Sequence, residues 1–359
     1  MSSATGATHQ VGKVTVVLAT YNRPDVLRVA IRSVLRQTFK DWTLTVVGDH
    51  CDSRTEQVVH SFSDERISYM NLPTRFGEQA GPNSVGMALS GTEYIALLNH
   101  DDVFLPDHLE VALKAMEASG GDLFLGRAAI ARTSVDHENG GRRPIFGLLN
   151  PARRPLSMIF HRHNGLVEPV STWIFTSALA RRVGPWNSHR DILRLPPQDW
   201  ILRAWRADAR FIFSKEVTVL SLATQYQYPS EKGSYSRESA EHKYLDILLE
   251  NADNLSIRSQ IEEDFGPGGG MQGMTRVYGA HSPLGRLLVK LAANPVTAIA
   301  YRVTGLDICS VLLPFAGARK GEGMEHLIKL RTGIGQPFIE DYRFLLNRVI
   351  SQFGGEKWT

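Results

Sequence analysis

The sequence predicts an α/β protein with a mostly parallel central sheet flanked by helices, followed by a helical C-terminal region. Short apolar, β-branched segments alternate with amphipathic helical segments in the first third of the chain. Such alternation is typical of crossover units that join parallel strands. Polar clusters directly follow several of these strands, and from Glu238 onward the pattern is helical.

Within the first third, each expected strand is a short apolar run, and each expected helix repeats apolar residues at a spacing of three to four. Pro24 stands at a favoured first helical position, which begins the first helix there. The helices are expected at 24–35, 53–62, 83–89 and 106–116. The strands are expected at 14–19, 44–47, 67–72, 94–98 and 122–126.

The middle of the chain changes character. Asn139-Gly140-Gly141 predicts a hairpin between 128–134 and 143–149. Further strands are expected at 170–175, 211–213 and 217–222, with a helix at 198–205. Beyond them, helical patterns at 244–249, 257–265, 284–313 and 324–350 are interrupted by a glycine-rich break near 266–273.

Length and pattern together predict the domain organisation. At roughly 150 residues per domain, 359 residues correspond to two or three units. We expect a flexible N-terminus over residues 1–12, one domain over 13–235, and a C-terminal region over 236–359. That region would shape a substrate site, mediate oligomerisation or lie on a membrane surface.

Composition excludes several classes of protein. The formal net charge of +3 gives no basis for a nucleic-acid partner. Cys51 and Cys309 are the only cysteines, which excludes a disulfide scaffold and favours a reducing compartment such as the cytoplasm. No uninterrupted apolar run reaches the roughly 18–20 residues of a membrane span. The stretch 284–291 carries Arg286 and Lys290 among leucines, which suits peripheral contact with a membrane or a helix–helix interface of a homo-oligomer.

Three polar clusters fall at the carboxyl ends of expected strands: 20–23, 49–52 and 99–102. Ligands of parallel α/β sheets bind at this edge, although polar loops also occur there without a function. The third cluster contains Asp101 and Asp102, two adjacent carboxylates that repel each other unless a cation or hydrogen-bond donors neutralise them. A divalent cation with phosphate oxygens as its other ligands would do so. A solvated lead into the next helix is the alternative.

The motifs together resemble those of the family 2 glycosyltransferases, which have the GT-A fold. The resemblance runs from Lys13 to Leu222. It is carried by Thr20-Tyr21-Asn22-Arg23-Pro24, Gly48-Asp49, Asn83, Asn99-His100-Asp101-Asp102, Leu105-Pro106-Asp107 and Gln198-Asp199-Trp200. It implies a nucleotide-diphospho-sugar donor, with UDP favoured, and an acceptor hydroxyl on a glycan, a lipid-linked glycan or a small metabolite.

The resemblance also implies roles for single residues. Asp49 matches the carboxylate that accepts from the uracil ring N–H, although an Asp there could also cap the next helix. The other expected contacts to the nucleotide are Thr20, Tyr21, Asn22, Arg23, Arg75, Asn83, Asn99, His100 and Asp101. Asp101 and Asp102 are the expected ligands of Mg²⁺ or Mn²⁺. The family's Asp-x-Asp motif reads Asn99-His100-Asp101 here, which lowers the charge of the ligand set.

Asp199 matches the general base of inverting members of the family. One carboxylate that deprotonates the acceptor hydroxyl during a single displacement inverts the anomeric configuration. The alternative for Asp199 is a first-turn acid of its helix. Trp186, Gln198 and Trp200 are expected near the acceptor.

Two other functions remain open from the sequence. A nucleotidyltransferase would need a glycine-rich, basic loop after the first strand, where Thr20-Tyr21-Asn22-Arg23 stands instead. A non-catalytic module that binds nucleotide sugar or glycan is favoured by Asn99 and Gln198 and opposed by Asp101 and Asp199.

Overall fold

The computed structural model describes most of the chain. The described residues are 12–135, 142–148, 169–193, 195–222, 254–265, 295–306, 311, 313–316, 319–321, 325, 337 and 339–358. The predicted flexible N-terminus, the hairpin turn at 139–141, the helix at 244–249, the glycine-rich break and the basic helix at 284–291 lie outside these residues, apart from Gly12.

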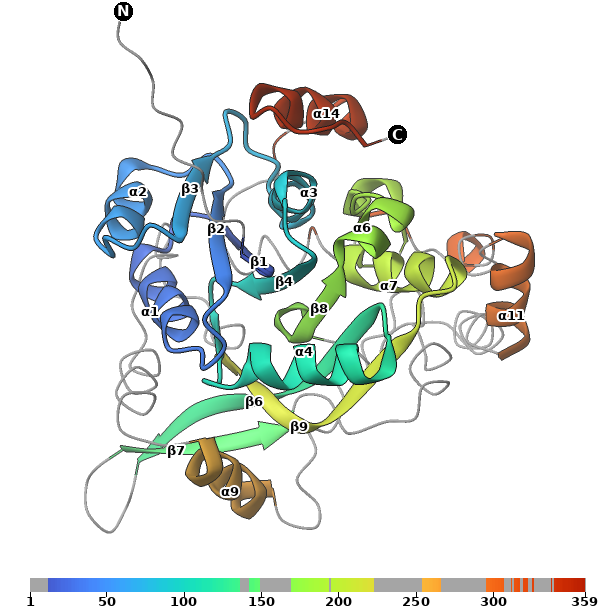
Figure 1. Cartoon of the computed structure of the whole chain (residues 1–359). Coiled ribbons are helices and arrows are strands. Elements are labelled where there is room, and N and C mark those ends of the chain that lie inside the picture. The colour runs from blue at the N-terminus through green and yellow to red at the C-terminus, as the bar shows by residue number, and fades with distance from the viewer. Residues whose placement is uncertain are drawn as a thin grey trace, which may run out of the picture.

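A nine-stranded sheet forms the centre of the described part (Figure 1). Its order is β3-β2-β1-β4-β8-β6-β9-β5, and β7 pairs with β6. The strands are β1 (Val14–Thr20), β2 (Trp42–Gly48), β3 (Ile67–Asn71), β4 (Tyr94–Asn99), β5 (Asp102–Phe104), β6 (Leu123–Val135), β7 (Arg142–Leu148), β8 (Trp173–Thr176) and β9 (Phe211–Leu222).

Helices cover both faces of this sheet. They are α1 (Pro24–Leu35), α2 (Ser53–His60), α3 (Ala80–Leu89), α4 (His108–Ser119), α6 (Ser177–Val183), α7 (Pro196–Arg206), α9 (Asn254–Phe265), α11 (Pro295–Thr304) and α14 (Tyr342–Gln352). Short 3-10 turns lie at η1 (Val170–Thr172), η2 (His189–Asp191) and η4 (Leu313–Ala316). The predicted α/β class is therefore confirmed.

The sheet is parallel in its first half and mixed in its second. Strands β3, β2, β1 and β4 pair in parallel, as the alternating pattern predicts. The pairs β4–β8, β6–β8, β6–β7 and β5–β9 are antiparallel, and β6–β9 is parallel. The two strands expected at 211–213 and 217–222 are one continuous strand, β9, whose pairing with β6 shifts register. The first three residues of the strand expected at 170–175 form η1 instead.

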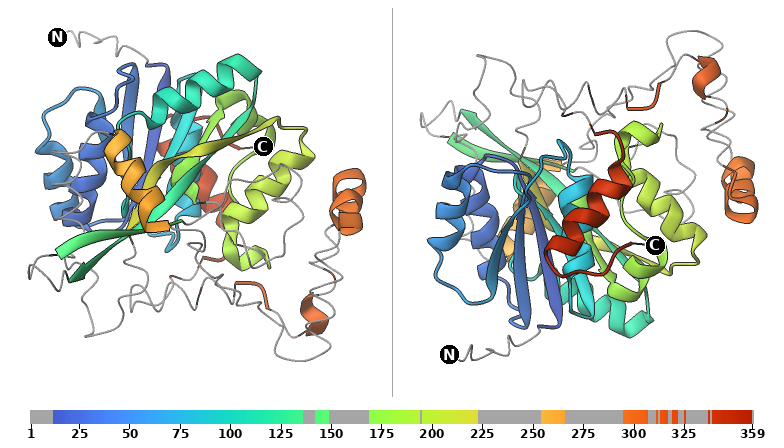
Figure 2. Two further views of the ribbon diagram at one scale, coloured as in Figure 1. Left: turned by 90° about the horizontal axis from the view of Figure 1, so that it is seen from below. Right: turned by 90° about the horizontal axis from the view of Figure 1, so that it is seen from above.

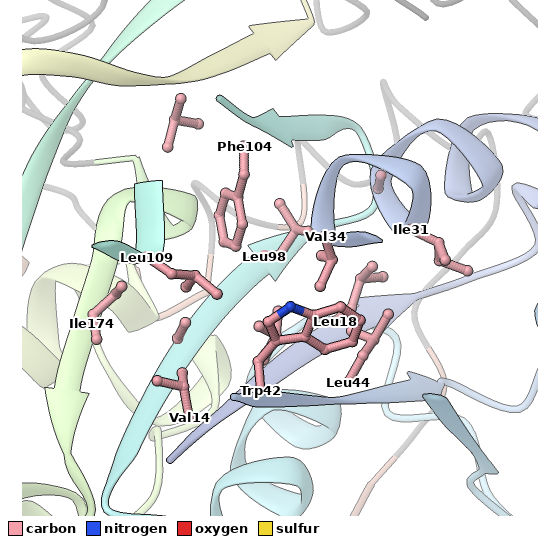
Figure 3. Close-up of a cluster of buried hydrophobic side chains, with 14 of the residues drawn as sticks. Val14, Leu18, Ile31, Val34, Trp42, Leu44, Leu98, Phe104, Leu109 and Ile174 are labelled. Atoms are coloured by element: carbon pink, nitrogen blue, oxygen red, sulfur yellow. The ribbon is translucent and has the colours of Figure 1, made fainter. Parts of the chain in front are cut away.

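Alternating side chains of the strands feed two apolar layers, because successive residues of a strand point to opposite faces. In β1, Val16 and Leu18 join the layer under α1, α2 and α4, while Val17 joins the opposite layer. Figure 3 shows the first layer, where Trp42 of β2 and Phe104 of β5 pack among aliphatic side chains. The buried sheet thus holds the polar strand ends in fixed positions.

The C-terminal helix α14 completes the second layer. Its Leu346, Val349 and Ile350 are fully buried in the cluster that contains α3, α6 and α7. Figure 2 shows α14 alongside α3, and the Trp358 Nε1–H donates to the Ser84 carbonyl at 3.3 Å. Residues 339–358 are therefore part of the core around the central sheet, although they lie far from its strands in sequence.

The helix α11 contacts the rest of the fold through α7. The Arg302 guanidinium lies 5.1 Å from the centre of the Trp205 ring and pairs with Asp208. Arg206 lies over the Tyr301 ring in return. Among the described residues, none of the helices combines the length and apolar character that crossing a membrane requires.

Candidate active site

The parallel strands bring the predicted polar clusters to one edge of the sheet. Thr20 is in register with Gly48, and Ala19 with Asn99. The Asp49 backbone N–H donates to the Thr20 carbonyl at 2.9 Å, which joins the first two clusters directly. The convergence predicted from the strand-end motifs is therefore present.

Asp49 is a buried carboxylate that holds a loop. Its two oxygens accept from the backbone N–H groups of Phe76 and Gly77, at 2.6 and 2.7 Å. Burial raises the pKa of Asp49 to about 7, and the two backbone bonds oppose this rise. Asp49 does not cap α2, because Asp52 does so by accepting from the Arg54 N–H. Asp49 therefore belongs to the strand edge and fixes the loop that follows β3.

The turn after β1 meets this same loop. The Arg75 guanidinium lies 4.4 Å from the centre of the Tyr21 ring, a distance typical of a cation–π contact. Asn22 has a left-handed backbone with φ of 45°, and its Oδ1 accepts from the Asp52 N–H at 2.8 Å. Two segments that the sequence analysis proposed for the nucleotide thus lie in contact.

Asp101 and Asp102 have different environments. The Asp101 Oδ2 lies 3.5 Å from Nη1 of the buried Arg23. Asp102 begins β5 and is 3% exposed, and its Oδ2 accepts from the Ser171 Oγ–H at 2.5 Å and from the Asn99 amide at 3.0 Å. Burial, and then the charge of Asp101, raise the pKa of Asp102 to about 7.

Asn99, which stands where the family's motif has its first Asp, donates two hydrogen bonds within this cluster. Its Nδ2–H donates to Asp102, and its backbone N–H donates to the Ser171 hydroxyl at 2.9 Å. An Asp at this position would place a second carboxylate against a buried one, and the two would repel. The neutral Asn99 amide avoids this repulsion and donates a hydrogen bond to the Asp102 carboxylate.

This geometry distinguishes the two predicted metal ligands. Oδ2 of the buried Asp102 already accepts from two donors of the fold, whereas the Asp101 side chain is 17% exposed. The described residues hold no group of three or more His, Cys, Asp or Glu side chains that could enclose an ion. One carboxylate combined with diphosphate oxygens fits the chemistry of Mg²⁺ and Mn²⁺ sites in nucleotide enzymes. Asp101 remains the candidate ligand.

Asp199 lies in the first turn of α7 and is held by one of its two oxygens. The Asn187 amide and the Arg203 Nε–H both donate to its Oδ2, at 2.9 and 2.8 Å. Its Oδ1 takes no hydrogen bond from the residues that the structure describes. Arg203 is itself fixed by the carbonyls of Val183 and Pro185. The carboxylate is therefore oriented through Oδ2, while the described part of the chain leaves Oδ1 without a hydrogen bond.

Comparison with known proteins identifies the family to which these motifs belong. Residues 15–182 match the model of the glycosyl transferase family 2. Residues 15–182 therefore have the sequence of a family 2 glycosyltransferase domain. The Escherichia coli UDP-Glc:alpha-D-GlcNAc-diphosphoundecaprenol beta-1,3-glucosyltransferase WfgD is 30% identical over 103 residues, which are 29% of this chain and 40% of WfgD.

Two further relatives are similar over limited stretches. The Escherichia coli WcaA, a putative colanic acid biosynthesis glycosyl transferase, is 28% identical over 45% of this chain and 56% of its own length. The Staphylococcus aureus poly(ribitol-phosphate) beta-N-acetylglucosaminyltransferase TarP is 28% identical over 33% of this chain and 37% of its own. The glycosyltransferase chain thus matches about a quarter to about half of the length of its first curated relatives.

The fold is that of a solved glycosyltransferase. The structure of residues 1–349 of S. aureus TarS, in complex with UDP-GlcNAc, aligns with a TM-score of 0.50 and 16% sequence identity. The alignment covers 92% of this chain and 99% of that structure. The GT-A fold predicted from the motifs is therefore confirmed.

Two of the residues predicted near the acceptor lie in the core of the protein. Trp186 and Trp200 are fully buried, and both pack against Trp173 with ring centres 5.7 and 5.9 Å away. Neither ring has a face on which a sugar could stack. The contact between Trp200 and Trp173 packs α7 against β8, and α7 carries Asp199. Gln198, next to Asp199, is half-buried.

Thr20 and Asn83 are two predicted nucleotide contacts that each have a buried polar atom without a hydrogen-bond partner among the described residues. Thr20 is 3% exposed and Asn83 is 2% exposed. The Thr20 Oγ1 and the Asn83 Nδ2 have no hydrogen-bond partner among the described residues. Buried polar groups are normally satisfied by protein, water or ligand. His100, in the turn between β4 and β5, is half-buried beside the motif's Asp101.

The residues that hold the Asp102 and Asp199 carboxylates were not predicted from the sequence. Arg203 follows Asp199 by four positions in a helix, a spacing that places the two side chains on one face, so that signal was present. Asn187 and Ser171 belong to distant segments, and neither has a motif around it. Only the fold reveals their contacts with the site.

The raised pKa of Asp49 makes the stability of the glycosyltransferase depend on pH. In the unfolded chain an Asp has a pKa of about 3.9, whereas burial raises that of Asp49 to about 7. The folded state therefore binds the proton more tightly, and the free energy of unfolding falls as pH rises from about 4 to about 7. The raised pKa of Asp102 likewise makes the free energy of unfolding fall as pH rises.

We expect Asp49→Asn to reduce the fall in Tm between about pH 5 and about pH 8, because one of the two buried ionisations is removed. Circular dichroism melts of the wild type and the variant measure this slope. Glu65→Gln, at an exposed position, is the matched control and should leave the slope unchanged. An Asp49→Asn slope as steep as that of the wild type would show that Asp49 is already ionised below pH 5.

Proposed function

We propose that the protein is an inverting glycosyltransferase that moves a sugar from a nucleotide-diphosphate donor, with UDP favoured, to an acceptor hydroxyl. The observation that carries this proposal is the geometry of Asp199. Its Oδ2 is fixed by Asn187 and Arg203, and its Oδ1 takes no hydrogen bond from the described residues. An oriented carboxylate with one available oxygen is suited to general base catalysis.

In this mechanism Asp199 accepts the proton of the acceptor hydroxyl as that oxygen attacks the anomeric carbon. The bond to the diphosphate breaks in the same displacement, so the configuration at the anomeric carbon inverts. Asp101 would hold Mg²⁺ or Mn²⁺, which when bound neutralises charge on the leaving diphosphate. The role of Arg203 is to keep the Asp199 carboxylate in one rotamer.

The donor would lie along the carboxyl ends of β1, β2 and β4. Asp49 is placed to accept from a uracil ring N–H, and Tyr21 and Arg75 offer a stacked aromatic and cationic surface for the base. The solved TarS structure with UDP-GlcNAc and the UDP-Glc specificity in the name of WfgD support a UDP sugar. The acceptor is a hydroxyl of a glycan, a lipid-linked glycan or a small metabolite.

A thermal-shift panel of nucleotide sugars, each with and without Mn²⁺, tests this function. A ligand that binds only the folded state raises Tm by an amount that grows with the ratio of its concentration to its Kd, so the donor should give the largest shift, and only with the metal. Product formation with that donor and a panel of glycan acceptors follows. If no nucleotide sugar shifts Tm at millimolar concentration, the proposed donor class is wrong.

A further inference from the structure

Glu78 is a buried carboxylate that no motif of the donor or acceptor site includes. It directly follows the loop residues Phe76 and Gly77, and its side chain is 2% exposed. Its Oε1 accepts from the Ser188 Oγ–H at 2.7 Å. Its Oε2 accepts from the His189 backbone N–H at 3.2 Å and lies 2.9 Å from the His189 Nδ1.

Burying a carboxylate is costly unless donors compensate the lost hydration. Among the described residues, all of the donors to Glu78 come from two consecutive residues, Ser188 and His189, which are 3% and 1% exposed. Glu78 therefore binds one short segment tightly, the segment that runs into η2 and on toward α7. An apolar contact could join the two loops, but it would not fix their relative orientation as these directional bonds do.

The two segments that Glu78 joins each hold one carboxylate of the candidate site. On one side, the backbone N–H groups of Phe76 and Gly77 bind Asp49. On the other side, Asn187 precedes Ser188 and donates its amide to Asp199. Glu78 thus stands between the loop that contacts the expected base of the donor and the segment that orients the expected general base.

We propose that Glu78 is a positioning residue that fixes Asn187, and through it Asp199, relative to the donor loop. This inference rests on the proposed function. It assigns to Glu78 an effect on turnover rather than on donor affinity. When Glu78 is replaced, Asp49 keeps its hydrogen bonds from the backbone of Phe76 and Gly77. Ser188, which directly follows Asn187, loses its hydrogen bond to the Glu78 carboxylate. A misplacement of about 1 Å at a reacting group can lower the rate by about 100-fold.

Glu78→Gln tests the inference, because it keeps the size of the side chain while replacing one acceptor oxygen by a donor that faces His189. We expect kcat for transfer to fall by about tenfold or more, with the KM for the donor within about twofold of wild type. Asn187→Ala should give a similar fall in kcat. The double variant should be no slower than the slower single variant, because both changes break one connection.

Two further variants separate positioning from stability. Asp107→Asn breaks the bidentate ion pair between Asp107, which directly precedes α4, and Arg258 of α9, outside the candidate site. It should lower Tm and leave kcat unchanged. Ser188→Ala removes one donor to Glu78 and should lower kcat by a smaller factor, and it replaces Glu78→Gln as the test if that variant does not fold.

Each other result has a defined meaning. Wild-type kcat in Glu78→Gln, or effects of Glu78→Gln and Asn187→Ala that multiply in the double variant, would overturn the positioning role while the proposed function stands. A wild-type protein that transfers no sugar from any nucleotide donor would overturn the proposed function and this inference with it.

Discussion

Replacing Asp199 by Asn should lower kcat for sugar transfer by about 10²–10⁴-fold, the range over which general base catalysis contributes. The amide has nearly the same shape but cannot accept the proton of the acceptor hydroxyl. The dissociation constant of UDP should stay within about twofold of wild type, because the proposed base-binding residues lie on β1, β2 and the loop after β3. Single-turnover kinetics and calorimetry measure the two quantities separately.

Asp191→Asn is the matched control for this prediction. Asp191 is an exposed carboxylate in η2, close in sequence to Asp199. Its variant should transfer sugar at the wild-type rate. If Asp199→Asn retains a rate near that of the wild type, another group takes the proton and Asp199 is only the first-turn acid of α7, stabilised by the helix dipole.

Local sequence was sufficient for the parallel half of the fold and for the position of the strand-end motifs. Runs such as 14–19 and 94–98 are buried on both faces, and a continuous apolar run is the pattern of such strands. The strand β5 could not be predicted in this way. It has three residues, and its first, Asp102, reads as a polar loop residue until the partners on η1 and β4 are known.

The same limit explains the two tryptophans. Trp186 and Trp200 lie beside the expected acceptor site in sequence, but a stacking ring and a core ring have the same local signature. Their burial depends on Trp173 of β8, a contact between segments that no periodicity encodes. The α14 helix is a further example, since nothing in residues 342–352 indicates that they pack beside α3.

The two candidate catalytic carboxylates, Asp199 and Asp101, are each paired with an arginine. Asp199 is paired with Arg203 at 2.8 Å and Asp101 with Arg23 at 3.5 Å, and all four side chains are largely buried. For Asp199 the pairing leaves one oxygen for a proton. For Asp101 the guanidinium is a cation already near the oxygen that a metal would use. A metal held by Asp101 would therefore lie near Arg23, and the diphosphate would supply additional negative charge.

Asp101→Ala should remove the part of UDP affinity that depends on Mn²⁺. We expect the wild-type protein to bind UDP more tightly with Mn²⁺ than with EDTA, and the variant to bind equally weakly in both. Transfer should fall by about 10²–10³-fold, because stabilisation of the leaving diphosphate by a metal contributes several kcal/mol. Titration calorimetry in both buffers measures the difference.

Asp25→Ala, at an exposed position of α1, is the control and should keep the full effect of Mn²⁺. Asn99→Asp provides a second comparison, because it restores the family's Asp-x-Asp motif. The structure predicts that it does not increase metal affinity, since the new carboxylate would face the buried Asp102 rather than a cation. An Asp101→Ala protein that still gains affinity with Mn²⁺ would place the metal on other residues. The Asp101–Arg23 pair would then be a purely structural contact.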